Sequence, residues 1–468
     1  MSITGKDLTN LGFPEGKAFG LALEVMQRGY SHLTEVEQLA LLDQVMKNPL
    51  AFENDEHLHL VVGELLGPVD NTIALVDHSR AYSIYGADGI EQGALRQMEI
   101  AMKLPVTVAG ALMPDAHQGY GLPIGGVLAT RNAVIPYGVG VDIGCRMCMT
   151  LYNLPVNILD EKKDALKKLL LNNTMFGTAT FKKPKDHEVL ERKEFSEIKI
   201  VREMKDRAAK QIGSSGGGNH FVEFGVVEVL TPINEFNLAP GQYVAVLSHS
   251  GSRGLGANIA GHYTKLAMNE CKLPQEAKHL AWLDLDAESG HEYWLAMTLA
   301  GDYASACHHQ IHERIAIGLR ENPLAMIENH HNFAWKEKDA HGNEIIVHRK
   351  GATPAGAGVL GIIPGSMATP GFIVRGKGQA ASINSASHGA GRLMSRTKAK
   401  ETILPGHVNK FLQEAGVELI GSGLDEAPMA YKDIHQVMEN QKDLVHVLGS
   451  FMPKIVRMCG DERFKEVN

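Results

Sequence analysis

The sequence predicts an α+β fold, with a helical N-terminal extension, residues 1–70, followed by a single large mixed-sheet domain, residues 71–468. Three observations lead to this class. Apolar residues at helical spacing occupy the extension. In the large domain, apolar runs that end in polar, glycine-rich loops predict buried strands, and longer segments with helical spacing lie between those runs.

Each element has a local signal. In the extension, Thr34 and Glu37 fit a capping box for a helix that ends at Pro49, while His57 and His59 are expected to be surface histidines. In the large domain the patterns predict strands within 124–134 and at Tyr243–Leu247, helices near 90–102, 158–172 and 290–320, and a largely exposed helix over 186–212.

Composition limits the class of protein. The chain has 468 residues, of which 44% are hydrophobic and 21% charged, so it can bury a large core. A net charge of −8 argues against a surface that binds polyanions everywhere, but it allows a local basic groove. Five cysteines do not make a disulfide framework. The N-terminus lacks a signal-peptide pattern and no long apolar run predicts a membrane span, so we expect a soluble, cytoplasmic protein.

One stretch, Met113–Arg146, concentrates candidate chemistry. It begins with Asp115 and His117 in a frame rich in glycine and proline, and it ends with Asp142 and Cys145 among closely spaced glycines. Dense glycine lets a backbone adopt positive φ and approach a ligand. A carboxylate and a thiol three residues apart in such a loop can converge on one cation.

Three further loops carry donor side chains. Asn219, His220 and Glu223 follow a Gly/Ser loop at the start of an apolar strand, His249 follows the strand at Tyr243–Leu247, and His331 precedes Asn332. On an extended segment Asn219 and Glu223 are expected on one face and His220 on the other. A strand that ends in polar and glycine residues is typical of a site.

Other motifs are weaker. His308 and His312 have helical i,i+4 spacing but no HExxH motif, so they are interpreted as helix-surface or supporting residues. Cys145 and Cys148 form a CxxC that could be half of a zinc site or a redox pair, but no second CxxC or thioredoxin-like context is present, which argues against both. The segment at 371–378 lacks the Ser or Thr of a P-loop and is rejected as one.

A second focus lies at 387–400. His388 sits among small residues, and Arg392 and Arg396 follow it. If a helix begins near Gly391, the two arginines share one face. Guanidinium groups bind phosphate oxygens in bidentate geometry, so this arrangement is suited to phosphate. The alternative is a solvated basic helix face.

Five donors, taken together, suggest a metal centre: Asp142, Cys145, His220, His249 and His331. Carboxylate, thiolate and imidazole suit a borderline divalent ion, which leaves zinc, manganese, cobalt and iron open. More than four ligands would suggest two metals that share a bridging thiolate, a pairing that can clamp the oxygens of an in-line displacement at phosphorus.

Seven motifs stand in a fixed order: MPDAHQGYG, VGVDIGC, GGGNHFVE, SHSGSRG, HHN, PGSM and HGAGR. This order resembles that of the RtcB-type RNA ligases, the GTP-dependent enzymes that join RNA 3′-phosphate or 2′,3′-cyclic phosphate ends to 5′-hydroxyl ends in RNA repair or tRNA splicing. The resemblance runs from about residue 70 to about residue 460.

The resemblance implies a role for each matched residue. His388 is similar to the nucleophile that forms a histidyl-guanylate with GTP, and Asp115 to an aspartate needed for nucleotidyl transfer. The five donors resemble the ligands of one or two Mn²⁺ ions, with Cys145 as the bridge. Arg392 and Arg396 resemble holders of the RNA terminal phosphate. The implied guanylate pocket comprises Asn219, His220, Phe221, Val222, Glu223, His331, Asn332, Pro364, Gly365, Ser366, Met367, His388, Gly389, Ala390 and Gly391.

Two positions depart from the family pattern, and both fall on the implied guanylate pocket. Gly371 stands where the family has a serine, and Met458-Cys459-Gly460 stands where it has Lys-Gly, followed here by eight more residues. Arg146, after Cys145, is expected either to contact phosphate or to pair with a carboxylate. The expected partners are GTP, RNA and an archease-like activator. A 3′-phosphate guanylyltransferase with weak ligation, or a metal-dependent RNA-end binding protein without catalysis, are the alternatives.

Overall fold

The computed structural model describes residues 3–67, 71–421 and 423–460 and divides the chain into two compact units, Met1–Thr72 and Ile73–Asn468. The predicted α+β class is confirmed, because helices and a large mixed sheet occur together. Each unit has its own hydrophobic core and is described separately.

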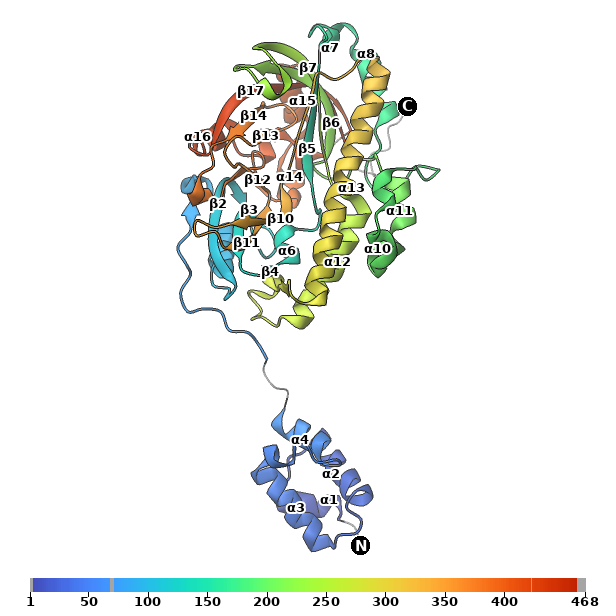
Figure 1. Cartoon of the computed structure of the whole chain (residues 1–468), viewed down its shortest axis with the longest axis vertical. Helices are drawn as coiled ribbons and strands as arrows, with labels where there is room; N and C mark the ends of the chain where they lie inside the picture. Colours follow the sequence, from blue (N-terminus) through green and yellow to red (C-terminus); the bar gives the residue numbers. More distant parts are fainter. Residues whose placement is uncertain (1–2, 68–70, 422, 461–468) are drawn as a thin grey trace. The chain divides into compact units, whose positions relative to one another are not determined.

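The first unit is helical (Figure 1). Its helices are α1 (Gly5–Leu11), α2 (Lys17–Arg28), α3 (Glu35–Lys47) and α4 (His59–Leu66). The capping box at the start of α3 is present: the Thr34 side chain accepts a hydrogen bond from Glu37 N, and the Glu37 carboxylate accepts one from Thr34 N at 2.8 Å. Leu8, Met26, Leu42 and Val61 are fully buried, so the four helices enclose one core.

The second unit is built on an eight-stranded sheet. Its main path follows the order β13 (Leu360–Ile363), β14 (Gly371–Gly376), β17 (Val445–Met458), β6 (Phe221–Val229), β7 (Gly241–Ser250), β5 (Arg146–Tyr152) and β9 (Ala325–His330), and β16 (Glu418–Ile420) pairs with β17. All pairings are antiparallel except that of β16 with β17. The predicted strand at 243–247 therefore lies in the interior of this sheet.

A five-stranded sheet carries most of the opening motif. Its order is β1 (Ser83–Ile84), β2 (Thr107–His117), β3 (Ile124–Thr130), β11 (Glu344–Lys350) and β10 (Asn332–Lys338). Two short ribbons complete the strands: β12 (Ala352–Pro354) pairs with β15 (Ser385–Ser387), and β4 (Ala133–Val134) pairs with β8 (Leu283–Asp284). The 124–134 region thus forms two strands, β3 and β4.

Helices surround these sheets (Figure 1). They are α5 (Gln92–Ala101), α6 (Pro136–Val139), α7 (Ile158–Glu161), α8 (Lys163–Asn173), α9 (Glu194–Glu197), α10 (Lys199–Glu203), α11 (Lys205–Gln211), α12 (Arg253–Glu270), α13 (Glu288–Leu319), α14 (Arg396–Thr402), α15 (Pro405–Ala415) and α16 (Ile434–Glu439). The helices predicted near 90–102, 158–172 and 290–320 are present as α5, α7 with α8, and α13.

The predicted helix over 186–212 is wrong in two respects. The segment forms separate short helices, because Ile198 adopts extended backbone angles between α9 and α10. It is also not largely exposed: Phe195, Val201 and Ile212 are buried against α12 and α13. Burial of these apolar side chains outweighs the charge of the segment and holds it on the core.

The large sheet is apolar on both faces. On β5, Met147, Met149 and Leu151 face one core, while Tyr152 faces the opposite core with α8 and α13. Successive strand residues point to opposite faces, so the strands nearest the site are covered on both sides. α13 runs alongside β5 in Figure 1. Among the described residues, no helix is long and apolar enough to serve as a membrane span.

Candidate functional site: a thiol–imidazole cluster beside a buried Asp–His pair

Sheet topology brings the predicted donors together. His220 immediately precedes β6, His249 lies near the end of β7, Cys145 immediately precedes β5 and His331 follows β9. These four strands are adjacent in the sheet and antiparallel, in the order β6-β7-β5-β9. The start of one strand therefore lies beside the end of the next. The four donors meet at the same end of these strands, although Cys145 and His331 are 186 residues apart in the sequence.

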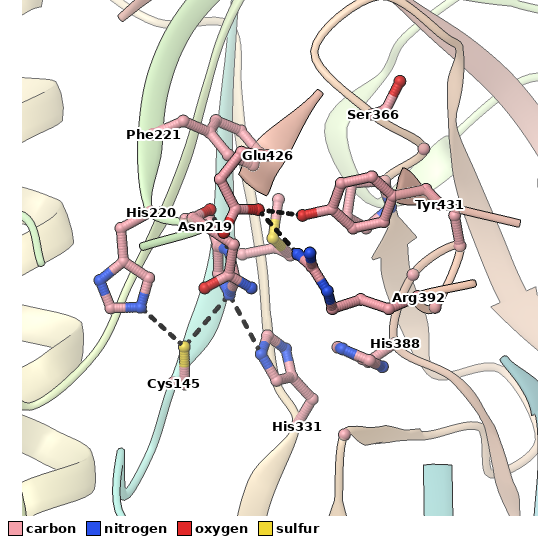
Figure 2. A pocket seen from close by; sticks show the side chains of 18 of the residues that line it. Cys145, Asn219, His220, Phe221, His331, Ser366, His388, Arg392, Glu426 and Tyr431 are labelled. Carbon is pink, nitrogen blue, oxygen red and sulfur yellow. Dashed lines mark hydrogen bonds and ion pairs between the residues drawn. The ribbon is translucent and has the colours of Figure 1, made fainter. Parts of the chain in front are cut away.

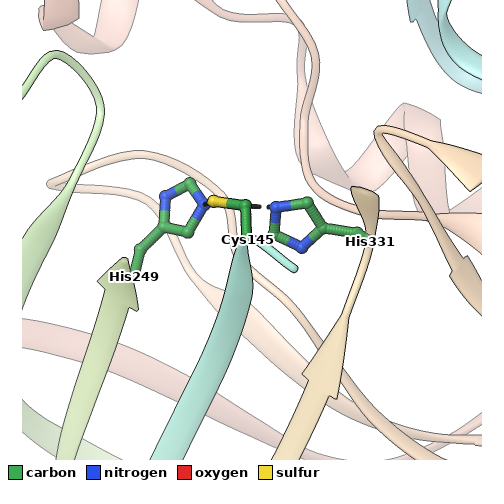
Figure 3. Close-up of side chains that lie close together, drawn as sticks. All are labelled: Cys145, His249 and His331. Carbon is green, nitrogen blue, oxygen red and sulfur yellow. Dashed lines mark hydrogen bonds between the residues drawn. The ribbon is translucent and has the colours of Figure 1, made fainter. Parts of the chain in front are cut away.

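The donor atoms are within reach of one another. Cys145 Sγ lies 3.1 Å from His249 Nε2 and 3.4 Å from His220 Nε2, and His249 Nε2 lies 3.2 Å from His331 Nε2. Asp142 Oδ2 lies 3.0 Å from His220 Nε2. Figure 3 shows the His249 and His331 rings on either side of the Cys145 side chain. Two candidate three-donor groups result, Cys145–His249–His331 and Asp142–Cys145–His220, and Cys145 belongs to both.

The loop before β5 aims Cys145. Gly144 has φ +70°, and a Cβ there would lie 2.8 Å from the Cα of Gly301 in α13, so this approach requires glycine. Arg146 then points away from the cluster: it donates to Glu328 Oε1 at 3.2 Å and to Gly301 O at 2.7 Å. Of its two expected roles, the structure gives Arg146 the carboxylate pairing.

Burial keeps two imidazoles of the cluster neutral, those of His249 and His331. It lowers the pKa of His249 to about 3 and that of His331 well below its usual value. Burial works against ionisation of Asp142, but the hydrogen bond with His220 lowers the pKa of this carboxyl overall. Burial, and then the charge of Asp142, raises the pKa of the Cys145 thiol. Neutral imidazole and carboxylate are metal-ligating forms, and a bound cation favours loss of the thiol proton.

His331 Nδ1 and His220 Nδ1 are buried and have no hydrogen-bond partner within the described residues. The Nε2 atoms of the same rings face the other way and converge with His249 Nε2 and Cys145 Sγ at 3.1–3.4 Å, and nitrogen and sulfur atoms gathered this closely fit a missing cation. The residues therefore fit a divalent cation.

His388 lies beside this cluster and is held by Asp115. Asp115 Oδ2 lies 2.6 Å from His388 Nδ1 and also accepts hydrogen bonds from the backbone N–H groups of His388 and Gly389, at 3.1 and 3.3 Å. The His388 and His331 ring centroids are 4.9 Å apart. Asp115 is fully buried. A carboxylate that accepts from Nδ1–H leaves Nε2 of the same ring as the nucleophilic nitrogen.

One pocket unites these groups. A cavity of about 360 Å³ is lined by the five predicted donors and by His388, as well as by His117, which burial holds at a pKa of about 4. This volume is within the range of small-molecule sites. In Figure 2, His331 lies between Cys145 and His388, His220 lies beyond Cys145, and Arg392 lies beside His388.

Most of the implied guanylate pocket lines this cavity. The lining includes Asn219, His220, Phe221, Glu223, His331, Asn332, Pro364, Gly365, Ser366, Met367, His388, Gly389, Ala390 and Gly391. Val222 is not brought there: its side chain packs into the core beneath α8 and α13. His220 was expected opposite Asn219 and Glu223, yet it lines the same cavity, because β6 begins only at Phe221 and the backbone before it is not a regular strand.

No helix begins near Gly391, so the condition under which Arg392 and Arg396 would share a helix face is not met, although both arginines line the pocket. Gly391 has φ +75°, Arg392 forms an isolated bridge with Tyr431, and Ser395 is the N-cap of α14, so the helix begins only at Arg396. The two arginines converge through acidic partners instead. Arg392 donates to Glu426 Oε2 at 3.4 Å, and Arg396 pairs with Asp425 at 2.9 Å and with Glu426.

Several lining residues were missed from the sequence. Glu426 and Tyr431, which are hydrogen-bonded to each other, stand in an acidic stretch that resembles ordinary surface. Lys350 also lines the pocket; burial lowers its pKa to about 7, and its Nζ donates to Tyr120 O at 2.5 Å. The position of this lysine at the end of a buried strand, next to Gly351, is the sequence signal that could have identified Lys350 as a pocket residue.

The two departures from the family pattern are located at or near the pocket. Gly371 lines it, and a Cβ at this position would lie 3.2 Å from Pro364 Cα, so a side chain there would require a small shift. Met458 lines the pocket at the end of β17, while Cys459 does not appear in its lining. The eight residues that follow Gly460 lie outside the described part of the chain.

The fold is α+β, and its pocket holds thiol, imidazole and carboxylate donors beside a buried Asp–His pair. These features place the protein in the class of α+β proteins with a candidate metal centre in a small-molecule pocket. Comparison with known families makes this specific. Residues 97–199 and 173–458 match the family model described as tRNA-splicing ligase RtcB, and the chain belongs to the RtcB family.

Individual relatives agree. The chain is 34% identical over 389 residues to the RNA-splicing ligase RtcB of Escherichia coli K12, which covers 77% of this chain and 92% of the relative. It is 31% identical over 418 residues to the tRNA-splicing ligase RtcB of Methanococcus maripaludis, covering 74% and 85%. It is 29% identical over 439 residues to that of Nanoarchaeum equitans, covering 78% and 91%.

Proposed function

We propose that this protein is an RNA ligase that joins RNA 3′-phosphate or 2′,3′-cyclic phosphate ends to 5′-hydroxyl ends, using GTP and Mn²⁺. The family supports RNA ligation, since relatives carry the names RNA-splicing and tRNA-splicing ligase. The observation that carries the proposal is that His388, held by Asp115, lies in one pocket with the Cys145 cluster and two arginines.

In this proposal His388 is the nucleophile. Its Nε2 attacks the α-phosphorus of GTP, a nitrogen–phosphorus bond forms, and the bond to the leaving pyrophosphate breaks. Asp115 orients the ring and stabilises the positive charge that develops on it, because its carboxylate accepts from Nδ1 at 2.6 Å. The guanylate then passes to an RNA 3′-phosphate, and the 5′-hydroxyl of the second RNA attacks this activated end and releases GMP.

The donor cluster would hold one or two divalent ions. Asp142, Cys145, His220, His249 and His331 are the ligands in this proposal, and Cys145 is shared, in keeping with its place in both three-donor groups. A bound divalent ion offsets the negative charge of the phosphates. Manganese is the ion that the family resemblance implies.

The other pocket walls suit the nucleotide and the RNA end. Glu223 lines the pocket, and burial raises the pKa of its carboxyl. The N–H groups of a bound guanine would favour the ionised carboxylate, which would accept hydrogen bonds from them. Arg392 and Arg396 would bind the terminal phosphate. Both guanidinium groups are ion-paired with Glu426 in this structure. The RNA phosphate would replace some of these contacts with Glu426.

A covalent labelling experiment tests the proposal. Incubation with α-labelled GTP and Mn²⁺ should leave label on the protein that is labile to acid and stable to base, as expected of a phosphoramidate. His388→Ala should remove the label, while His407→Ala, an exposed histidine in α15, should retain it. No label on the unmodified protein, or label that persists in His388→Ala, would contradict the proposal.

A second candidate is a 3′-phosphate guanylyltransferase that ligates weakly. It is favoured by Gly371, which lines the guanylate side of the pocket without the family's serine, and by Cys459 in place of lysine. Incubation with a 3′-phosphate RNA and a 5′-hydroxyl RNA separates the candidates. Guanylate-capped RNA that accumulates without joined product would support the second, and efficient joining would exclude it.

A further inference from the structure

A second thiol–imidazole cluster lies on the opposite face of the strands that carry the first. Its members are Cys148 on β5 and His308 and His312 on α13, and one donor atom from each lies within 4.8 Å of the others. All three are fully or almost fully buried. His308 and His312 are one helical turn apart and therefore project from the same side of α13 toward β5 and β7.

Hydrogen bonds fix which ring nitrogens converge. His308 Nδ1 and His312 Nε2 both contact Ser248 Oγ, at 2.6 and 2.8 Å, so these two atoms face a common point. Ser248 is the strand partner of Cys148 in the β5–β7 register, which puts the thiol-bearing residue beside the same point. A thiol, two imidazoles and a hydroxyl are thus directed into one small volume.

The remote nitrogens are held by oxygen. His308 Nε2 lies 3.1 Å from Ser250 O, and His312 Nδ1 lies 2.8 Å from Thr150 Oγ1. A ligating histidine commonly donates its other N–H to a carbonyl or hydroxyl oxygen, which fixes its tautomer and direction. The arrangement around His308 and His312 already has this form.

A cavity and an ion pair lie beside the cluster. The cavity, of about 570 Å³, is lined by His312 and Thr150 but not by Cys148 or His308, and the exposed Ile317 in its lining places it at the surface near the end of α13. Glu328, the strand partner of Cys148 on β9, interacts electrostatically with Cys148, as does Arg146 with the opposite sign. Glu328 and Arg146 pair with each other at 3.2 Å, so their opposite effects on Cys148 partly cancel, and a divalent ion with one thiolate would add a net charge of +1 beside this ion pair.

We propose that Cys148, His308 and His312 form a structural zinc site, with the Ser248 hydroxyl or a water as the fourth ligand. The first cluster includes the Asp142 carboxylate, whereas this one offers one sulfur and two imidazoles without a carboxylate. A donor set without carboxylate favours zinc over manganese, which prefers oxygen ligands. On binding, the Cys148 thiol gives its proton to solvent and a Zn–S bond forms. The site would stabilise β7 on the face opposite the pocket, because Ser248 and Ser250 flank His249 of the first cluster on this strand.

The alternative is a metal-free relay. Ser250 O can accept from His308 Nε2–H, Ser248 can donate to His308 Nδ1 and accept from His312 Nε2–H, and Thr150 can donate to His312 Nδ1. This relay satisfies both neutral rings, so it is a complete structure by itself. The two states differ in one observable, a sulfur–metal bond at Cys148.

The test uses the full chain with Cys145→Ala, which removes the thiol of the first cluster. Co²⁺ is added to the metal-stripped protein, because a cobalt–thiolate bond gives an intense near-ultraviolet charge-transfer band that imidazole and carboxylate ligands do not give. We expect this band at about one equivalent of Co²⁺, and X-ray absorption of the zinc form should show one sulfur at about 2.3 Å and nitrogen at about 2.0–2.1 Å.

Two second-site variants locate the sulfur. Cys145→Ala/Cys148→Ser should lose the band and weaken zinc binding at least about a hundredfold. Cys145→Ala/Cys307→Ser is the matched control, since Cys307 is also buried and adjoins His308 in α13 but belongs to the core cluster formed with α12 and not to the thiol–imidazole cluster; it should keep the band. If Cys148→Ser prevents folding, His312→Gln in the same background removes one ligand and should reduce affinity as strongly.

The outcomes are decisive in both directions. No thiolate band in the Cys145→Ala protein, or a band that persists after Cys148→Ser, overturns the zinc site and leaves the relay. Because these readouts use neither GTP nor RNA, failure of the proposed ligase activity would not change them.

Discussion

Asp115 Oδ2 lies 2.6 Å from Nδ1 of His388, and this carboxylate also accepts from two successive backbone N–H groups, those of His388 and Gly389. The arrangement fixes both the position of the loop and the tautomer of the ring. Asp115 is therefore a positioning residue for the proposed nucleophile.

Asp115→Asn should slow covalent labelling by GTP about a hundredfold or more while the protein stays folded. The new amide can donate to Nδ1, and this would place the remaining proton on Nε2, where the lone pair is needed. Labelling rate against pH, measured in single-turnover experiments, checks this. Asp339→Asn, in an exposed turn, is the control and should label normally. Unchanged labelling in Asp115→Asn would remove the orienting role.

Cys145→Ser should weaken Mn²⁺ binding at the first cluster at least about a hundredfold, because Cys145 is shared by both three-donor groups. Electron paramagnetic resonance of free Mn²⁺ during a titration gives the affinity. Cys271→Ser, a buried thiol at the end of α12, should leave affinity unchanged. Equal affinities in the two variants would show that the ion is held elsewhere.

Arg396→Ala should weaken binding of 3′-phosphate RNA and reduce the slope of log K against log salt by about 0.7, as expected when one phosphate contact on a single strand is lost. Fluorescence anisotropy at several salt concentrations measures both quantities. Arg131→Ala removes an exposed arginine from the turn between β3 and β4 and should keep the slope. An RNA without the 3′-phosphate should bind both variants alike.

Glu328→Gln should lower the free energy of unfolding by about 1–3 kcal/mol, since it leaves the buried Arg146 guanidinium without its anionic partner. Burial opposes ionisation of Glu328, but the hydrogen bond with His309 and the charge of Arg146 hold its pKa well below the usual value. A depressed carboxyl pKa stabilises the fold above the unfolded-state pKa and loses this effect on acidification.

Urea unfolding at several pH values provides the measurement for Glu328→Gln. The difference from the unmodified protein should be largest near neutral pH and should begin to narrow below about pH 4.3. Glu344→Gln, which removes an exposed partner of Lys336, should change stability by less than about 0.5 kcal/mol. A pH-independent difference for Glu328→Gln would argue against the ion pair as its cause.

Removal of residues 1–72 should leave the melting temperature of the remaining unit within about 2 °C of its value in the full chain. The reason is that each unit has a separate core: the cluster around Leu8, Met26 and Leu42 contains only residues of the first unit. Calorimetry of both proteins makes the comparison. A larger loss would mean that the first unit stabilises the second.

The donor residues could be predicted from the sequence, but the strand order that brings them together could not. Cys145, His220 and His249 each stand at a boundary between a glycine-rich or polar loop and an apolar run, and such boundaries are visible in a single sequence. The strand order β6-β7-β5-β9 is not visible, because it depends on long-range pairings such as Cys148 with Ser248, 100 residues apart. The convergence of the donors needed this order.

Other failures have local causes. A helix begins at Arg396 and not near Gly391, because the Ser395 side chain caps the backbone N–H of Lys398 and so sets the first turn. The spacing of two arginines carries no such start signal. His308 and His312 were expected to be helix-surface or supporting residues, and the structure excludes the surface reading, because α13 lies against the sheet along the face that carries them and both are buried. Glu426 was not predicted as a pocket residue because an acidic residue is ordinarily exposed to solvent.

The β5–β7 register has a consequence for how this protein can misfold. Side chains alternate across a strand, so a slip of one residue would turn His249 away from the ligand cavity and bring Ser248 or Ser250 in its place. Such a chain would keep its hydrogen-bonded ladder and much of its apolar burial, yet it would have exchanged an imidazole for a hydroxyl at the metal cluster. Recovery of native secondary structure after refolding is therefore no measure of recovered competence, and metal uptake is the stricter criterion.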